Sequence, residues 1–205
     1  MLPEIWEPRM KVVFVGTVVS ELSDTLGFYH LHKRDRFWEL IEMATITPKR
    51  FLTPQEGKAL ADGHRDGSLS DPVRMMFIQK RTSQLLQLGI GFTDLNRRMI
   101  AGNEKDKFAR PTEEDICEFV EKAERLEPRV LAFVTSAYVF VESFKSRYPD
   151  ARSTLGPQPF KIGTSEVWLL GSTSGSLRGE ALSTQEDLFV ALGERIAPFR
   201  AKAPE

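Results

Sequence analysis

Apolar runs alternate with amphipathic stretches along this chain, and the alternation predicts strands that follow one another with helices between them. The four predicted strands are residues 11–15, 88–93, 130–135 and 167–170. Such an order is typical of an α/β fold. We therefore expect a three-layer α/β/α sandwich around a central, mainly parallel four-stranded sheet.

Apolar side chains at helical spacing predict the helices. These are residues 36–44, a helix capped by Thr112 that ends before Pro128, residues 137–144, and a last helix that begins at a Ser183–Glu186 capping box. Residues 61–84 fit less well, because two Asp-Gly turns precede Asp71-Pro72, a typical helix start. We expect a loop and then a short helix there, as an insertion in the domain.

Size and composition fit one globular domain over residues 1–205. The chain is 41% hydrophobic and 28% charged, with a net charge of −1. No apolar run is long enough to cross a bilayer, and the N-terminal segment lacks the basic start of a signal peptide, so a cytoplasmic protein is expected. Nothing in the pattern marks an oligomer interface, so we expect a monomer without an obligate protein partner.

The single cysteine, Cys117, lies in a helical apolar stripe and is predicted to be a buried thiol. One cysteine excludes cysteine-ligated zinc and iron–sulfur sites, and three histidines are weak evidence for a metal. We expect neither a metal nor a cofactor. Charge is unevenly distributed, because residues 113–127 carry seven acidic side chains while cations gather elsewhere. This predicts one basic face and an opposite acidic face.

Two strand exits carry small polar residues, Thr17-Val18-Val19-Ser20 after Gly16 and Gly171-Ser172-Thr173-Ser174-Gly175 after Leu170. Ligands of open α/β sheets bind beyond the carboxyl ends of the strands, so both loops are expected at one pocket. Residues 27–38 follow the first loop and combine aromatic rings, imidazoles and cations, as a site for unstacked bases requires. Neither loop has the glycine pattern of a P-loop or a dinucleotide site.

Several segments occur in the order found in one family. Residues 12–16 followed by Gly27-Phe28, His32 and Arg36-Phe37-Trp38 resemble its GINPG loop and GF...H...RFW segment, and residues 171–178 resemble its NPSGLSR loop. Residues 52–56, 88–95 and 162–168 are similar to segments between them. The resemblance is to the uracil-DNA glycosylase superfamily, nearest the mismatch-specific uracil- and thymine-DNA glycosylases, and it covers most of residues 10–195.

The resemblance implies an α/β protein that flips a damaged base into a pocket and cuts its N-glycosidic bond, generally without a metal. This chain departs from the family at the catalytic asparagine or aspartate, where it has Val18, and at the following Pro-Gly, where it has Val19-Ser20. In the second loop the family's asparagine and proline fall at Ser172 and Thr173, and its wedge leucine falls at Ser176.

Site residues follow from these positions. The predicted catalytic residues are Asp24, Ser172 and Ser20, with Asp24 the first candidate for activating water and Glu21 the second. The predicted base-binding residues are Gly16, Thr17, Val18, Phe28, Tyr29 and His30. The predicted DNA-binding residues are Ser174, Gly175, Ser176, Leu177 and Arg178, and Arg74, Lys80 and Arg81 are further candidates for phosphate contacts.

The expected function is that of a monofunctional uracil-DNA glycosylase. It would act on single- or double-stranded DNA containing uracil, and on other deaminated bases if the pocket admits them, to leave an abasic site. The alternative is a catalytically weak or inactive base-binding module of the same fold, since valine cannot orient water. An enzyme of free nucleosides or nucleotides is a third possibility.

Overall fold

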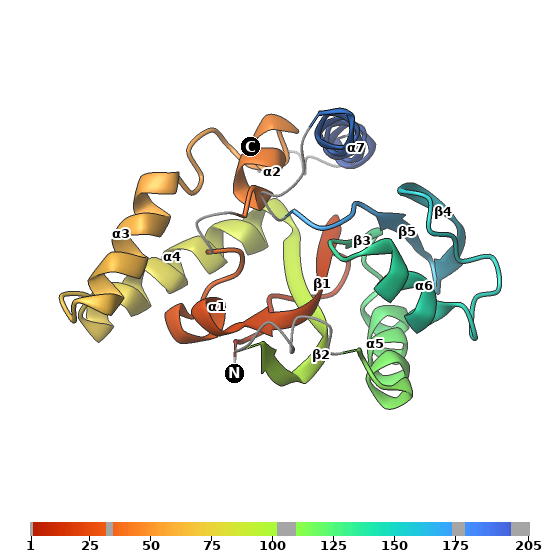
Figure 1. Ribbon diagram of the computed structural model, residues 1–205, viewed down its shortest axis with the longest axis horizontal. Coiled ribbons are helices and arrows are strands. Elements are labelled where there is room, and N and C mark those ends of the chain that lie inside the picture. Colours follow the sequence, from red (N-terminus) through yellow and green to blue (C-terminus); the bar gives the residue numbers. More distant parts are fainter. Residues whose placement is uncertain (1, 32–34, 102–109, 174–178, 198–205) are drawn as a thin grey trace, which may run out of the picture.

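The computed structural model describes residues 2–31, 35–101, 110–173 and 179–197, which fold around a single sheet (Figure 1). The sheet has five strands in the order β2-β1-β3-β5-β4. They are β1 (Val12–Ser20), β2 (Ile90–Ala101), β3 (Val130–Phe133), β4 (Gly156–Ile162) and β5 (Ser165–Leu169). Neighbouring strands are parallel except β4, which is antiparallel to β5. The predicted α/β fold with a mainly parallel sheet is confirmed.

The predicted number of four strands is wrong, because the prediction omitted β4. Its sequence contains Pro157 and Pro159, and proline cannot donate a hydrogen bond within a sheet. The strand tolerates both prolines because it lies at the edge of the sheet and pairs with β5 alone.

Helices cover both faces of the sheet (Figure 1). Those in the described ranges are α1 (Glu21–Leu26), α2 (Phe37–Met43), α3 (Pro54–Arg65), α4 (Asp71–Leu88), α5 (Glu113–Leu126), α6 (Ala137–Phe144) and α7 (Glu180–Ile196). None of these helices is long and apolar enough to span a bilayer.

Two aromatic clusters show how the layers pack. Phe14 of β1 contacts Phe37 of α2 and Phe189 of α7, with ring centroids 4.9 and 6.4 Å away. Phe14 lies opposite Ala132 of β3, so the next residue of β3, Phe133, points to the other face. There it contacts three phenylalanines of α5 and α6, namely Phe119, Phe140 and Phe144. The predicted three-layer sandwich is confirmed.

Residues 61–84 lie in two long helices joined by a turn at residues 66–70, and the predicted loop with a short helix is wrong. α3 has 12 residues and begins at a Thr53–Glu56 capping box, and α4 has 18 residues and begins at Asp71-Pro72 as predicted. The side chain of Arg81, 11% exposed, pairs with Glu56 at 2.8 Å and lies over the ring of Phe51. Arg81 therefore fastens α4 to α3, and its burial contradicts the DNA contact predicted for it.

Two details of the helix predictions are also wrong. α7 begins at Glu180, so Ser183 lies inside the helix and does not cap it. Cys117 is partly exposed and its sulfur lies 3.1 Å from the guanidinium of Arg147, so it is not a buried thiol. By contrast, the capping box of Thr112 and Asp115 forms as predicted.

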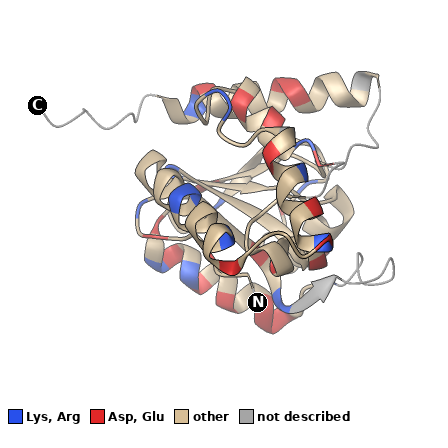
Figure 2. Cartoon of the chain, turned by 90° about the vertical axis from the view of Figure 1, so that its left-hand side faces the viewer, with Lys and Arg blue, Asp and Glu red and all other residues tan. Residues whose placement is uncertain are grey.

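One side of the molecule carries charges of both signs (Figure 2). The side of the molecule that carries α3 and α4 shows cations and anions interspersed (Figure 2). Arg74, for example, is paired with Asp71 at 2.9 Å and donates a hydrogen bond to the carbonyl of Thr25. A division into a basic and an acidic face is not seen from this side.

Candidate functional site

The predicted first loop is a strand and a helix start. β1 continues to Ser20, and Val18 pairs with Asn96 of β2 before the register shifts. The hydroxyl of Ser20 accepts a hydrogen bond from the backbone N–H of Ser23, which caps α1. Asp24 lies in the first turn of that helix. The loop was predicted because glycine and hydroxyl residues favour turns, but pairing with the long strand β2 keeps this segment extended.

Asp35 joins the second of the two loops that were expected at one pocket to the segment of residues 27–38. Its carboxylate contacts Nδ1 of His30 at 2.7 Å and accepts a 2.6 Å hydrogen bond from the hydroxyl of Thr173, which follows β5. The backbone N–H of Arg36 donates to the carbonyl of Thr173 at 3.1 Å. The segment before α2 and the start of the second loop therefore meet. Ser174, Gly175, Ser176, Leu177 and Arg178 lie outside the described residues.

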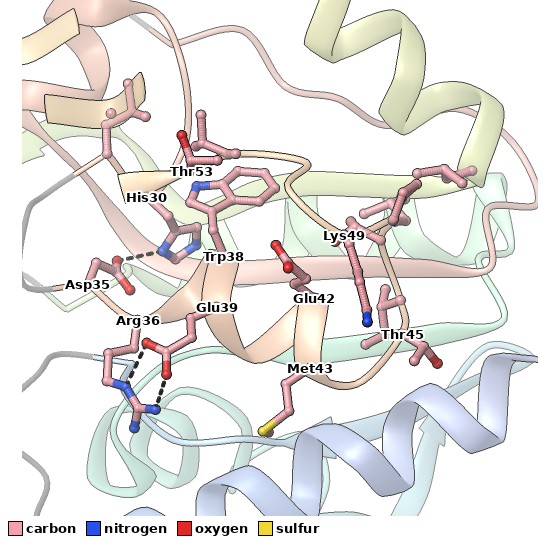
Figure 3. Close-up of a pocket in the computed structure, with 18 of the residues that line it drawn as sticks. His30, Asp35, Arg36, Trp38, Glu39, Glu42, Met43, Thr45, Lys49 and Thr53 are labelled. Carbon is pink, nitrogen blue, oxygen red and sulfur yellow. Dashed lines mark hydrogen bonds and ion pairs between the residues drawn. The ribbon is translucent and has the colours of Figure 1, made fainter. Parts of the chain in front are cut away.

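His30 is held rigidly at this junction. Its imidazole stacks on the ring of Phe37 at 4.0 Å and an interplanar angle of 12°. Its backbone has a φ of 56°, a conformation that is uncommon for a residue other than glycine. The side chain is 17% exposed, and it lines a large groove beside Asp35 (Figure 3).

The pKa of Asp35 reflects these contacts. Burial alone would raise it, but the charge of His30 and the hydrogen bonds from His30, Thr173 and the N–H of Phe37 outweigh burial. The pKa of Asp35 therefore lies below its ordinary value. In the tautomer of the neutral ring whose Nδ1–H donates to this carboxylate, Nε2 is left as an acceptor.

Asp94 of β2 is a second unusual carboxyl group. Burial raises its pKa to about 6, against the attraction of His30 and Arg97 and with a smaller contribution from Glu4. Its Oδ2 has no hydrogen-bond partner within the described residues. Its Oδ1 faces Gly16, where a side-chain Cβ would overlap it. Strongly shifted acids of this kind are concentrated at functional sites.

Two of the predicted base-binding side chains belong to the core. Phe28 is 1% exposed and stacks on Trp38, and Tyr29 is 6% exposed and stacks on Phe92. Burial raises the pKa of Tyr29, with Asp94 adding to the effect. Of the three rings predicted to stack on a base, His30 alone lines the groove.

The remaining predicted site residues lie near the same ends of the strands. The hydroxyl of Thr17 is 2.5 Å from that of Thr135, which follows β3. Ser172 is exposed, and its carbonyl accepts a 2.9 Å hydrogen bond from the buried amide of Gln185 in α7. Gln185 thereby fixes the chain immediately before Thr173.

The groove beside His30 is large, with a volume of about 1980 Å³. It runs from His30 and Asp35 along α2 to the segment after that helix, where Lys49 points into it (Figure 3). Residues of α3 and α7 complete the walls. In the described ranges, no group of three or more histidine, cysteine, aspartate or glutamate side chains is arranged to hold a metal.

The prediction from sequence did not include Asp35, Thr173 or Asp94 among the site residues. Asp94 offered a signal, because it is an acid inside an apolar strand, where an unpaired charge is costly. Asp35 offered none, since an aspartate between two arginines in a polar segment is an ordinary surface pattern.

The chain matches no known family model. Among solved structures it is similar to the solution NMR structure of a candidate uracil DNA glycosylase from Methanosarcina acetivorans. The two chains are 17% identical, the match covers 93% of this chain and 96% of that one, and the TM-score is 0.49. This is a distant likeness that extends over nearly the whole of both chains.

Proposed function

We propose that this protein is a DNA glycosylase that flips uracil out of DNA and hydrolyses its N-glycosidic bond, with His30 as the group that activates water. The sequence segments that resemble uracil-DNA glycosylases suggest the reaction, most closely the mismatch-specific group. The observation that carries the proposal is the junction of His30, Asp35 and Thr173, which joins two of those segments at one end of a groove.

The chemistry requires a proton acceptor and a site for developing charge. Water adds to C1′ of the deoxyribose while the bond from C1′ to N1 of uracil breaks, and the bonding electron pair leaves with the base. Nε2 of His30 takes the proton from the water, and the ionised carboxylate of Asp35 stabilises the imidazolium that forms. The proton then passes to the uracil anion. General base catalysis of this kind contributes roughly 10²–10⁴-fold.

This assignment replaces Asp24, the first candidate from sequence. Asp24 lies in the first turn of α1, whereas His30 lines the groove and is oriented by a carboxylate. Asp35 is a positioning residue in this scheme, because it acts through the imidazole. Monomeric action in the cytoplasm remains part of the proposal.

The test is single-turnover cleavage of oligonucleotides that contain one uracil, single-stranded and duplex, followed by alkali to break abasic sites. We expect strand breakage by the wild type and a loss of about 10²-fold or more in His30→Gln. His64→Gln is the matched control, because His64 is an exposed histidine of α3 that lines the same groove. It should retain the wild-type rate.

Other outcomes would contradict the proposal in distinct ways. Binding without any breakage would identify a base-binding module. A loss in Asp24→Asn with full activity in His30→Gln would return the water-activating role to Asp24.

A further inference from the structure

The size of the groove exceeds what one flipped base needs. Pockets that enclose a drug-sized ligand have volumes of roughly 300–1,000 Å³. The groove holds about 1980 Å³, and it extends well beyond the junction of His30 and Asp35 (Figure 3). It can therefore hold several linked nucleotides.

The charges in its walls favour an anionic ligand. Glu39 is paired with Arg36 and Asp62 is paired with Arg65, so two acids are neutralised. Lys11, Lys49 and Lys58 also line the groove. In the part of the chain that the structure describes, none of these three lysines forms an ion pair.

Two acids weigh against this excess of cations, namely the ionised Asp35, whose pKa lies below its ordinary value, and Glu42. Glu42 accepts a hydrogen bond from the backbone N–H of Arg50, which satisfies an oxygen without neutralising the charge. Three lysines against two carboxylates still leave an excess of positive charge in the groove.

The lining of the groove includes apolar side chains and the buried hydroxyl of Thr47. Ile46, Leu52 and Ala61 contribute apolar side chains to the same groove as the lysines. Thr47 also lines the groove and is 3% exposed, and its hydroxyl has no hydrogen-bond partner in the described ranges. A buried hydroxyl of this kind is satisfied when a ligand supplies a donor or an acceptor.

We infer that this groove binds a single-stranded stretch of DNA, so that the protein prefers uracil in single strands to uracil in duplexes. A single strand exposes its phosphates, which the lysines can contact. It also exposes the faces and edges of its bases, which the apolar side chains of the groove and Thr47 can contact. A duplex covers its base faces by stacking, and the flipping of a paired base costs a few kcal/mol that a single strand avoids. The inference concerns the substrate of the proposed glycosylase and rests on that function.

The first experiment measures binding and needs no catalysis. Fluorescence anisotropy with a uracil-free oligonucleotide, single-stranded or in duplex, is recorded over a series of NaCl concentrations. We expect the single strand to bind at least about tenfold more tightly than the duplex. Lys49→Gln/Lys58→Gln should make the slope of log K against log salt shallower by about 1.4, since each phosphate contact on a single strand contributes about 0.7.

The control is Lys145→Gln/Lys161→Gln, which removes two exposed lysines that do not line the groove. It should keep the wild-type slope. Equal or tighter binding of the duplex, or an unchanged slope in the groove variant, would overturn the inference. Binding of a polyglutamate peptide as tightly as the single strand would also overturn it, by showing a general site for polyanions.

Cleavage of uracil-containing strands separates this inference from the proposed function. Preferential binding of single strands without excision would refute the glycosylase and leave the groove assignment standing. Excision at equal rates from single strands and duplexes would leave the glycosylase and refute the strand preference.

Discussion

Gly16 of β1 packs directly against the carboxyl group of Asp94 on the neighbouring strand β2, and a Cβ at Gly16 would overlap Oδ1 of Asp94. Gly16 thus makes room for a buried acid on the neighbouring strand. The glycine is required here for close approach and not for a special backbone angle, because it has no positive φ. Gly16 belongs to the first segment that resembles the uracil-DNA glycosylases, and Asp94 was not among the site residues predicted from the sequence.

Gly16→Ala should destabilise the protein, because the added methyl group must displace a buried carboxyl group. Overpacking of this kind costs about 1–3 kcal/mol. Urea unfolding measures the change. Gly57→Ala is the matched control, since Gly57 lies in α3 with open space around it. The control should be stabilised by about 0.5–1 kcal/mol, and equal effects of the two substitutions would contradict the packing argument.

Asp94 should make the wild type more stable as the pH falls towards 4. Its pKa is raised from 3.8 to about 6 in the folded state, so the folded protein binds a proton that the unfolded chain releases. This contribution is complete below pH 3.8 and is lost as the pH rises through about 6. Its full size is about 3 kcal/mol.

Asp94→Asn removes this dependence and serves as the reference. The free energies of unfolding of wild type and variant are measured from pH 4 to pH 7. As the pH rises, the value for the wild type should fall relative to the value for the variant. A difference that is constant over this range would show that Asp94 titrates normally.

Asp35 should have the opposite pH dependence. Its pKa is lowered in the folded state, since the charge of His30 and three hydrogen bonds outweigh burial. The stability that it contributes is therefore present above its ordinary pKa of 3.8 and is lost as the pH falls below that value. Unfolding free energies of the wild type and Asp35→Asn should converge in acid, and parallel curves would contradict the assignment.

Arg81→Ala should reduce stability and leave DNA binding as salt-dependent as before. The variant loses the ion pair with Glu56 and the cation–π contacts with Phe51 and Phe77. We expect a loss of about 1–3 kcal/mol, because Glu56 is half exposed and its charge stays hydrated. A double-mutant cycle with Glu56→Gln isolates the pair.

Lys80→Ala is the control for that prediction, since Lys80 is exposed on the same helix. It should leave the free energy of unfolding unchanged. A shallower salt dependence of DNA binding in folded Arg81→Ala would show that Arg81 contacts phosphate after all.

Much of the fold could be predicted from the sequence, because the pattern of apolar and polar residues in each strand or helix reflects which of its faces are buried. The run Val12-Val13-Phe14-Val15 is apolar at every position, which fits a central parallel strand covered on both faces. The helix at Thr112 has its cap and its apolar stripe within a few residues of each other. β4 escaped prediction because its prolines are acceptable only at a sheet edge, and a sequence does not show which strand is at the edge.

The candidate site depends more than the fold does on contacts between residues that are far apart in the chain. By itself the sequence determined the mainly parallel sheet and the segment with His30, since these follow from nearby residues. It did not determine the ends of the strands, since β1 continues to Ser20 and β2 to Ala101. Tertiary structure alone decided that Asp35 lies between His30 and Thr173, that Phe28 and Tyr29 are core, and that Asp94 is buried. Those facts depend on contacts between residues far apart in the chain, and the pKa of each carboxyl group follows from the burial and partners that such contacts create.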